Sequence, residues 1–331
     1  MTFIDSLRNY LSPQILVILC LGFISGVPYG VLMDPLNYWL SEEGIEKSTI
    51  GLLSLVFLIY SLKVFWAPLV DRLKIPRLHR LGQRKSWLFL SQFVTGLIIL
   101  SISFVEPKES LNIFVYLILA IGFFSATQDI CADALRIELV EKRELGEASA
   151  VFVIGWRIGA ILLSGVATFY LAEFFGWNFA YQMIGIIVIF LSFIFLILIK
   201  EPTREIRPPK DFFKEPLGWF EDSFLAPLKD LYLRYKNHLL LLLLLIFTYR
   251  LSDMFLGPMA MPFYRETGFT KIEVAEITNF YGLIMTILGG LFAGASVYRF
   301  GLSKNLVAGA ILTPLTNLPF IYLNMIGHDV N

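Results

Sequence analysis

The stretch LNIFVYLILAIGFFSATQDICADAL runs from Leu111 to Leu135 and is apolar over most of its length. It is long enough to cross the roughly 30 Å hydrocarbon core of a membrane as a helix. Asp129 and Asp133 lie near its end, four residues apart and therefore on one helical face. Because a carboxylate at membrane depth is costly, it normally faces a protein interior or a water-filled path. The stretch therefore predicts a helix bundle with a polar interior.

The composition agrees with a membrane protein. The chain has 331 residues, of which 56% are hydrophobic and 16% charged, and its mean hydropathy is +0.69. Soluble domains carry about 25% charged residues. We therefore expect an all-α polytopic membrane protein. The net charge of +0 argues against nucleic-acid binding, which requires a basic face.

Apolar segments long enough to span a membrane predict nine transmembrane helices, six before a long polar stretch and three after it. We expect three parts: a six-helix bundle over 1–199, a cytoplasmic linker with amphipathic pieces over 200–238, and a partial second bundle over 239–331. The predicted spans are 14–34, 50–70, 87–105, 111–135, 149–172, 177–199, 239–261, 276–298 and 305–323.

The distribution of basic residues predicts the orientation. Of the 27 Lys and Arg residues, 20 fall in the N-terminal segment and the loops after even-numbered spans, and 4 in the other loops. Since cytoplasmic loops carry the excess of Lys and Arg, the N-terminus is expected to be cytoplasmic. Nine spans would then place the C-terminus outside, in the periplasm.

An internal repeat supports two related halves. The chain reads YWLSEEGIEKSTIGLLS from Tyr38, after the first span, and PFYRETGFTKIEVAEIT from Pro262, after the seventh. A parallel repeat about six helices apart is typical of the two halves of a major-facilitator transporter. The matched pairs, at one constant offset, are Glu42 with Glu266, Gly44 with Gly268 and Lys47 with Lys271.

Charged residues inside the first bundle are expected to meet. At 1.5 Å per residue, Lys63, Asp129 and Arg157 fall at about one depth, with Asp133 one turn below. Their charges predict a paired network that makes the carboxylates tolerable. Two roles remain open for it: ion pairs that orient the helices, or a proton relay or substrate contact.

Two further charged motifs are candidates for function. Arg250 and Asp253 are i,i+3 neighbours near the middle of the seventh span, where they form either a cavity site or a self-contained ion pair. The loop after the second span reads APLVDRLKIPRLHRLGQRKSW and resembles the major-facilitator signature. That resemblance implies a cytoplasmic latch at Asp71 and Arg72, with Arg84 and Lys85 as further basic members.

Glycines predict close helix packing, with Gly22, Gly26 and Gly30 on the first span and Gly155 and Gly159 on the fifth. The sequence offers no catalytic constellation, because its three histidines are scattered and no metal-ligand cluster or phosphate loop appears. We therefore expect no enzyme activity, no metal and no cofactor.

Several motifs together resemble the AmpG-type muropeptide permeases over essentially the whole chain: GFISGVPYG, SATQDICADAL, GWRIGAILLSG, EPTRE and YRLSDMF. The resemblance implies an inner-membrane protein that imports anhydromuropeptides, the cell-wall recycling fragments, by proton symport. The partners are then a muropeptide-like substrate, the proton and membrane lipid. It also implies roles in proton coupling or substrate contact for Asp129 and Asp133, and in the central cavity for Arg157, Arg250 and Asp253.

One departure from that family is expected to matter. The chain ends after the third helix of the second bundle, so it resembles a family member truncated in its C-terminal half. A second chain or an oligomer would then supply the missing helices. The alternatives are a symporter for another polar metabolite, such as an acylated cofactor, and a truncated, non-transporting membrane relic.

Overall fold

A computed structural model describes residues 12–201, 215–244, 247, 267, 281–316 and 318–327. The chain divides into two compact units, Met1–Pro209 and Lys210–Asn331, and each is described by itself. Every regular element in the described ranges is helical.

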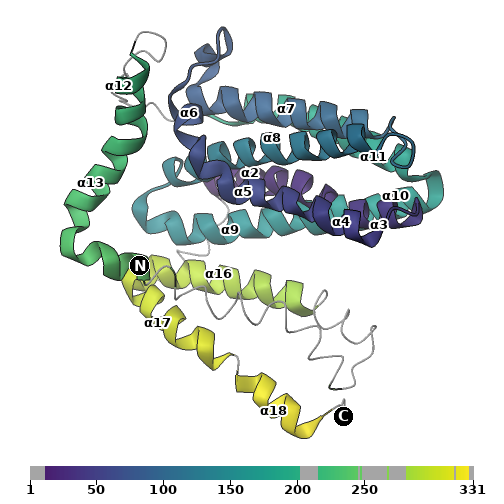
Figure 1. The fold of residues 1–331 in the computed structure, drawn as a ribbon. Helices are drawn as coiled ribbons and strands as arrows, with labels where there is room; N and C mark the ends of the chain where they lie inside the picture. Colours follow the sequence, from purple (N-terminus) through teal and green to yellow (C-terminus); the bar gives the residue numbers. More distant parts are fainter. Residues whose placement is uncertain are drawn as a thin grey trace. The chain divides into compact units, whose positions relative to one another are not determined.

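The helices of the first unit lie side by side with their axes roughly aligned (Figure 1). Helix α2 packs on α9 and η5, and α7 packs on both α8 and α11. The longer elements are α2 (Pro13–Val31), α3 (Asp34–Glu42), α7 (Gln83–Ile102), α8 (Leu111–Glu138), α9 (Leu145–Arg157), the π-helical η5 (Ile158–Ala167), α10 (Thr168–Phe175) and α11 (Trp177–Leu198).

The second predicted span is broken into short pieces. They are α4 (Lys47–Leu53), η1 (Ser54–Phe57), α5 (Leu58–Leu62), η2 (Lys63–Phe65) and α6 (Ala67–Arg72). Proline at the first turn of α6 contributes to the break, because it has no N–H to continue the hydrogen bonding of the preceding turn. The same chemistry separates α2 from α3, which also has proline in its first turn. A short loop containing η3 (Leu78–Leu81) leads to α7.

Seven helices in the described ranges are long and apolar enough to cross a membrane. Six of them, all in the first unit, match the first six predicted spans. The seventh, Leu302–Met325, matches the predicted ninth span, whereas the predicted eighth span matches a shorter apolar helix, Ile284–Phe300. Most of the predicted seventh span, 239–261, lies outside the described residues. The count of nine is therefore not confirmed.

The predicted glycine contact joins α2 to α9 and η5. Gly22, Gly26 and Gly30 each face backbone of the partner helix so closely that a Cβ would collide with it. Gly155 and Gly159 face the backbone of α2 in the same way. Backbone cannot retreat as a flexible side chain can, so these positions require glycine. The prediction of close approach is confirmed.

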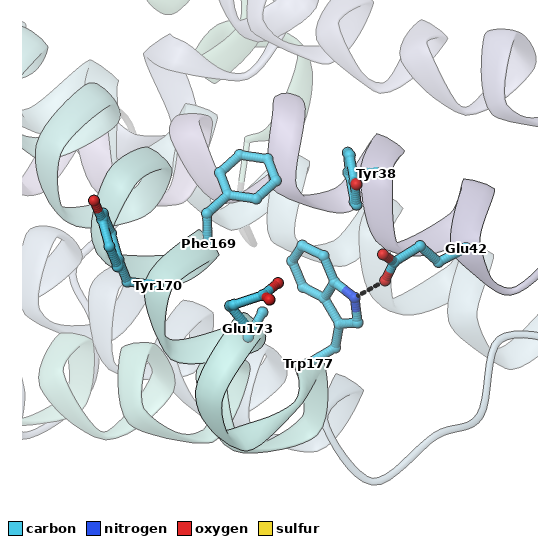
Figure 2. Close-up of a pocket in the computed structure, with 7 residues that line it drawn as sticks. Tyr38, Glu42, Phe169, Tyr170, Glu173 and Trp177 are labelled. Carbon is cyan, nitrogen blue, oxygen red and sulfur yellow. Dashed lines mark hydrogen bonds between the residues drawn. The ribbon is translucent and has the colours of Figure 1, made fainter.

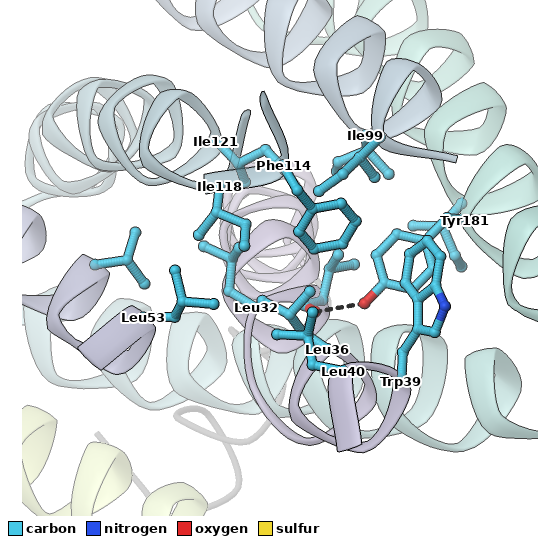
Figure 3. Packing of buried hydrophobic residues seen from close by; sticks show 14 of the residues in the cluster. Leu32, Leu36, Trp39, Leu40, Leu53, Ile99, Phe114, Ile118, Ile121 and Tyr181 are labelled. Atoms are coloured by element: carbon cyan, nitrogen blue, oxygen red, sulfur yellow. Dashed lines mark hydrogen bonds between the residues drawn. The ribbon is translucent and has the colours of Figure 1, made fainter. Parts of the chain in front are cut away.

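A hydrophobic core cluster fills the region where α2 runs into α3 (Figure 3). The Trp39 ring lies 5.3 Å from that of Phe114 and 4.9 Å from that of Tyr181, between centroids. The Tyr181 hydroxyl donates a hydrogen bond to the Val31 carbonyl at 3.1 Å, which satisfies the polar end of a buried side chain. A second cluster surrounds the first half of α2, with Ile15, Ile18 and Leu21 among its members.

The second unit is described in two stretches. In the first, α12 (Pro216–Phe220), the π-helical η6 (Glu221–Leu225), α13 (Ala226–Tyr235) and η7 (Lys236–His238) follow one another. The second holds α16 (Gly282–Phe300), α17 (Leu302–Leu315) and α18 (Leu318–Ile326). Asn305 donates to the carbonyls of Ser296 and Gly301, which fixes the turn between α16 and α17.

Candidate functional site

Lys63 and the two aspartates of α8 form an ion-pair cluster. The Lys63 ammonium lies 3.1 Å from Oδ2 of Asp133 and 3.7 Å from Oδ2 of Asp129. The broken second span brings Lys63 to this place, because η2 begins at that residue and contacts α8. One cation therefore serves two carboxylates that are one helical turn apart.

The two aspartates differ in surroundings. Asp133 has a second cation, because Arg136 lies 3.3 Å from its Oδ1 atom. The Asp133 side chain is also 42% exposed, against 18% for Asp129. Asp129 is thus the more buried carboxylate and has the longer contact with Lys63. It is the member of the cluster for which the negative charge is least compensated.

Arg136 is the cation that the sequence reasoning missed. Its guanidinium lies 4.7 Å from the centre of the Phe152 ring, an additional cation–π contact. The i,i+3 spacing to Asp133 could have revealed it. Arg157, the expected second cation, ends α9 and makes no ion pair within residues 12–201. The depth argument fixed its height along the helix but not the direction of its side chain.

An aromatic cluster lies next to these charges. The Tyr29 ring lies 4.8 Å from Phe57, 5.2 Å from Tyr60 and 5.2 Å from Trp156, between centroids. The Tyr60 hydroxyl donates to Oγ of Ser125 at 2.8 Å, and Ser125 is one turn before Asp129 on α8. We refer to Tyr29, Phe57, Tyr60 and Trp156 as the aromatic cluster. Aromatic surface beside a few placed charges is typical of a small-molecule site.

The predicted latch residue Asp71 is paired with Arg84. Its Oδ1 atom lies 3.2 Å from the Arg84 guanidinium, which also contacts Glu138 at 2.8 Å. The Arg84 side chain is only 7% exposed, and these two carboxylates compensate its nearly buried charge. Arg72 is the last residue of α6, directly after Asp71. Arg84 thereby ties the ends of α6 and α8 to the start of α7.

Glu201 is a further residue of this end that the sequence reasoning did not single out. Its carboxylate accepts hydrogen bonds from the backbone amides of Arg84 and Lys85, both at 3.1 Å. It therefore caps the N-terminus of α7, where unpaired amides and the helix dipole favour an anion. Gly82 precedes this turn with φ of 122°, a conformation that favours glycine. The contact fastens the chain after α11 to the start of α7.

Arg250 and Asp253, the other predicted site residues, lie outside the described residues. So does the second copy of the repeat, 262–278, apart from Thr267. In the part of the chain that is described, no group of three or more His, Cys, Asp or Glu could hold a metal ion. The described site therefore consists of the ion-pair cluster, the aromatic cluster and the Asp71–Arg84–Glu138 contacts.

Several apolar spans with charges inside the membrane are typical of a membrane transporter. Comparisons with known proteins give the same class. The sequence profile of the Major Facilitator Superfamily matches residues 16–329. The chain belongs to this superfamily.

Individual relatives narrow the assignment to the AmpG group. The chain is 40% identical to the "Putative transporter AmpG 4" of Rickettsia conorii over 309 residues, 93% of this chain and 73% of that protein. It is 33% identical to the "Anhydromuropeptide permease" of Escherichia coli K12 over 320 residues, 96% of this chain and 62% of that protein. A "Putative transporter AmpG 1" of Rickettsia bellii is 32% identical over 322 residues, 96% of this chain and 77% of that protein. The resemblance noted in the sequence is confirmed.

Proposed function

We propose that this chain imports anhydromuropeptides across the inner membrane and that proton uptake drives the import. The name of the Escherichia coli relative supports the substrate class. The observation that carries the proton coupling is the position of Asp129, which is only 18% exposed in a membrane-spanning helix and shares one lysine with Asp133. Intramembrane carboxylates of this kind are typical of proton pathways.

In the proposed mechanism, Asp129 is the carboxylate that takes the proton. When Asp129 is ionised, Lys63 divides its charge between two aspartates. When Asp129 is protonated, Lys63 pairs with Asp133 alone, and the contact that joins the second span to this point of α8 weakens. Protonation thereby changes the balance between two arrangements of these helices, which is what coupling requires.

The aromatic cluster is proposed to contact the sugar rings of the substrate. Tyr29 comes from α2 and Trp156 from α9. Phe57 and Tyr60 come from the broken second span. Their rings offer flat apolar surface, and the Tyr60 hydroxyl contacts Ser125, one turn of α8 before Asp129. A substrate bound there would lie against the residue that takes the proton.

We propose that the N-terminus and the Asp71–Arg84–Glu138 contacts face the cytoplasm, since the loops at that end are basic. Asp71 and its neighbour Arg72 then belong to the inner gate. Arg250 and Asp253 are proposed to contribute to the cavity from the second half of the chain, and Arg157 from the first.

The test is uptake of labelled anhydromuropeptide into proteoliposomes with an imposed inward proton gradient. Wild-type protein should accumulate the substrate and lose accumulation when a protonophore collapses the gradient. Asp129→Asn keeps the size of the side chain but cannot exchange a proton, so it should abolish accumulation. The matched control is Asp34→Asn, which changes an exposed aspartate in the first turn of α3.

Accumulation by Asp129→Asn at the wild-type level would remove Asp129 from the mechanism. Competition by unlabelled solutes tests the substrate class in the same vesicles. Anhydromuropeptide should compete, whereas an acylated cofactor should not. The opposite order would overturn the proposed substrate.

A further inference from the structure

A hollow lies between α3, α10 and the start of α11, at the end of the first unit opposite the Asp71–Arg84–Glu138 contacts. Its volume is about 320 Å³, within the range of small-molecule pockets. We call it the outer pocket. The residues that line it are Tyr38, Glu42, Phe169, Tyr170, Ala172, Glu173 and Trp177.

Of the four aromatic residues that line the outer pocket, Tyr38, Phe169 and Trp177 lie close to one another (Figure 2). Tyr38 lies 5.5 Å from Phe169 and 6.0 Å from Trp177, and Phe169 lies 5.8 Å from Trp177, between ring centroids. Trp39 stacks on Trp177 at 6.2 Å with an interplanar angle of 10°. Because Trp39 is itself buried in the core, the wall that Trp177 provides is held in place.

Two carboxylates complete the outer pocket, and no basic residue lines it. Oε2 of Glu42 accepts a hydrogen bond from Nε1 of Trp177 at 2.6 Å, which fixes both side chains. Figure 2 shows the Glu173 carboxylate directed toward the Trp177 ring. Glu173 has no hydrogen bond or ion pair within residues 12–201.

The combination of carboxylates and aromatic faces selects a particular ligand chemistry. Aromatic faces attract cations through the ring quadrupole, and aromatic cages recognise quaternary ammonium groups in this way. A metal ion is a poor fit, since calcium takes six to eight oxygen ligands and only two carboxylates line this pocket. A carbohydrate would also stack on aromatic rings and donate hydrogen bonds to carboxylates, but its neutral hydroxyls would leave the negative charge of Glu173 uncompensated.

We propose that the outer pocket is a binding site for an organic ammonium ion, with the cation beside the Glu173 carboxylate and against the aromatic surface that Tyr38, Phe169 and Trp177 form together. The site is distinct from the Lys63–Asp129–Asp133 cluster and does not depend on the transport mechanism proposed above. Two sources share this chemistry: the headgroup of a zwitterionic lipid, such as phosphatidylethanolamine, and a free amine or quaternary ammonium solute.

The test compares choline with its neutral isostere, 3,3-dimethylbutan-1-ol, by calorimetric titration of the delipidated full chain in a nonionic detergent. The two molecules have the same shape and differ in charge. Choline should bind saturably and the isostere should bind at least about tenfold more weakly. Equal affinity for both, or no saturable choline binding, would overturn the proposal.

Two variants locate the site. Glu173→Gln removes the charge and retains the size of the side chain, so choline affinity should fall at least about tenfold. Tyr38→Leu removes one exposed aromatic wall and should lower the affinity by a similar factor. The control is Glu109→Gln, an exposed glutamate in the loop between α7 and α8 that does not line the pocket. Unchanged affinity in Glu173→Gln would contradict the assignment.

Nanodiscs distinguish the two sources. If the headgroup of phosphatidylethanolamine is the ligand, choline binding should weaken in discs of that lipid and recover in discs of phosphatidylglycerol. If a free cation is the ligand, both discs should support the affinity seen in detergent. Loss of choline binding in both kinds of disc would show that the detergent result does not hold in a membrane and would overturn the proposal.

Discussion

Lys63 is the residue on which the charge cluster depends, since it contacts both Asp129 and Asp133. We predict that Lys63→Met destabilises the protein by roughly 1–3 kcal/mol, because it leaves a mostly buried carboxylate without its cation. The measurement is the midpoint of thermal unfolding in detergent. The double variant Lys63→Met/Asp129→Asn should regain most of the loss, as the unpaired charge is then removed. A double variant as unstable as the sum of its two single variants would contradict the pairing.

Part of this cluster could be predicted from residue positions alone. Counting 1.5 Å per residue brought Lys63 and Asp129 to one depth, and the structure places them 3.7 Å apart. The same count included Arg157, which has no ion pair in the described part of the first unit. Depth along a helix is set by sequence position, whereas the direction of a side chain depends on how the helix rotates against its neighbours. For this reason the second cation of the cluster is Arg136, which pairs with Asp133, and not the expected Arg157.

At the scale of elements, the glycine positions where α2 meets α9 should not tolerate a side chain. We predict that Gly26→Ala lowers stability by about 1–3 kcal/mol, because the new Cβ would meet the backbone of Trp156. The matched control is Gly51→Ala in α4, where no atom lies within 4 Å of the new Cβ. That change should be neutral or stabilise by roughly 0.5–1 kcal/mol through helix propensity. Equal losses in both variants would refute the packing argument.

Glu201 makes a second contact between elements that can be measured. We predict that Glu201→Ala costs about 1 kcal/mol of stability, because two amides at the start of α7 lose their acceptor. Lys85→Ala is the control, since it changes the side chain but keeps the backbone donor. Thermal unfolding of the two variants should separate them, and an unchanged midpoint for Glu201→Ala would argue against the cap.

The positions of the spans in the first unit could be predicted from the sequence, but their internal breaks could not. Long apolar runs specify which segments cross a membrane, and they identified the six spans of the first unit, from α2 to α11. The division of the second span into 3₁₀ and α pieces, and the π-helical η5, depend on packing between helices. Within the second span, the local signal for a break is the proline in the first turn of α6.

At the scale of the whole molecule, the Asp71–Arg84–Glu138 contacts are proposed to belong to the inner gate. We predict that Asp71→Asn lowers the initial rate of uptake several-fold but leaves the protein folded, because Arg84 retains Glu138. The double variant Asp71→Asn/Glu138→Gln leaves a nearly buried guanidinium with neither of these carboxylates and should cost about 3–5 kcal/mol. Uptake and thermal unfolding of the wild type, the single variants Asp71→Asn and Glu138→Gln, and the double variant provide the comparison. Simple additivity of the two single changes would contradict a shared role.

The central claim of the mechanism is that the proton crosses the membrane together with the substrate. Symport requires that substrate and proton move together, whichever of them supplies the gradient. A substrate gradient should therefore drive protons inward in the absence of a pH difference. This consequence distinguishes symport from facilitated diffusion, in which the substrate moves alone.

The most direct measurement is internal pH in proteoliposomes loaded with a pH-sensitive dye, after addition of anhydromuropeptide outside at equal pH. The account predicts internal acidification with the wild-type chain and with Asp34→Asn, and none with Asp129→Asn. Entry of substrate into wild-type vesicles with no change in internal pH would contradict proton coupling and the role assigned to Asp129.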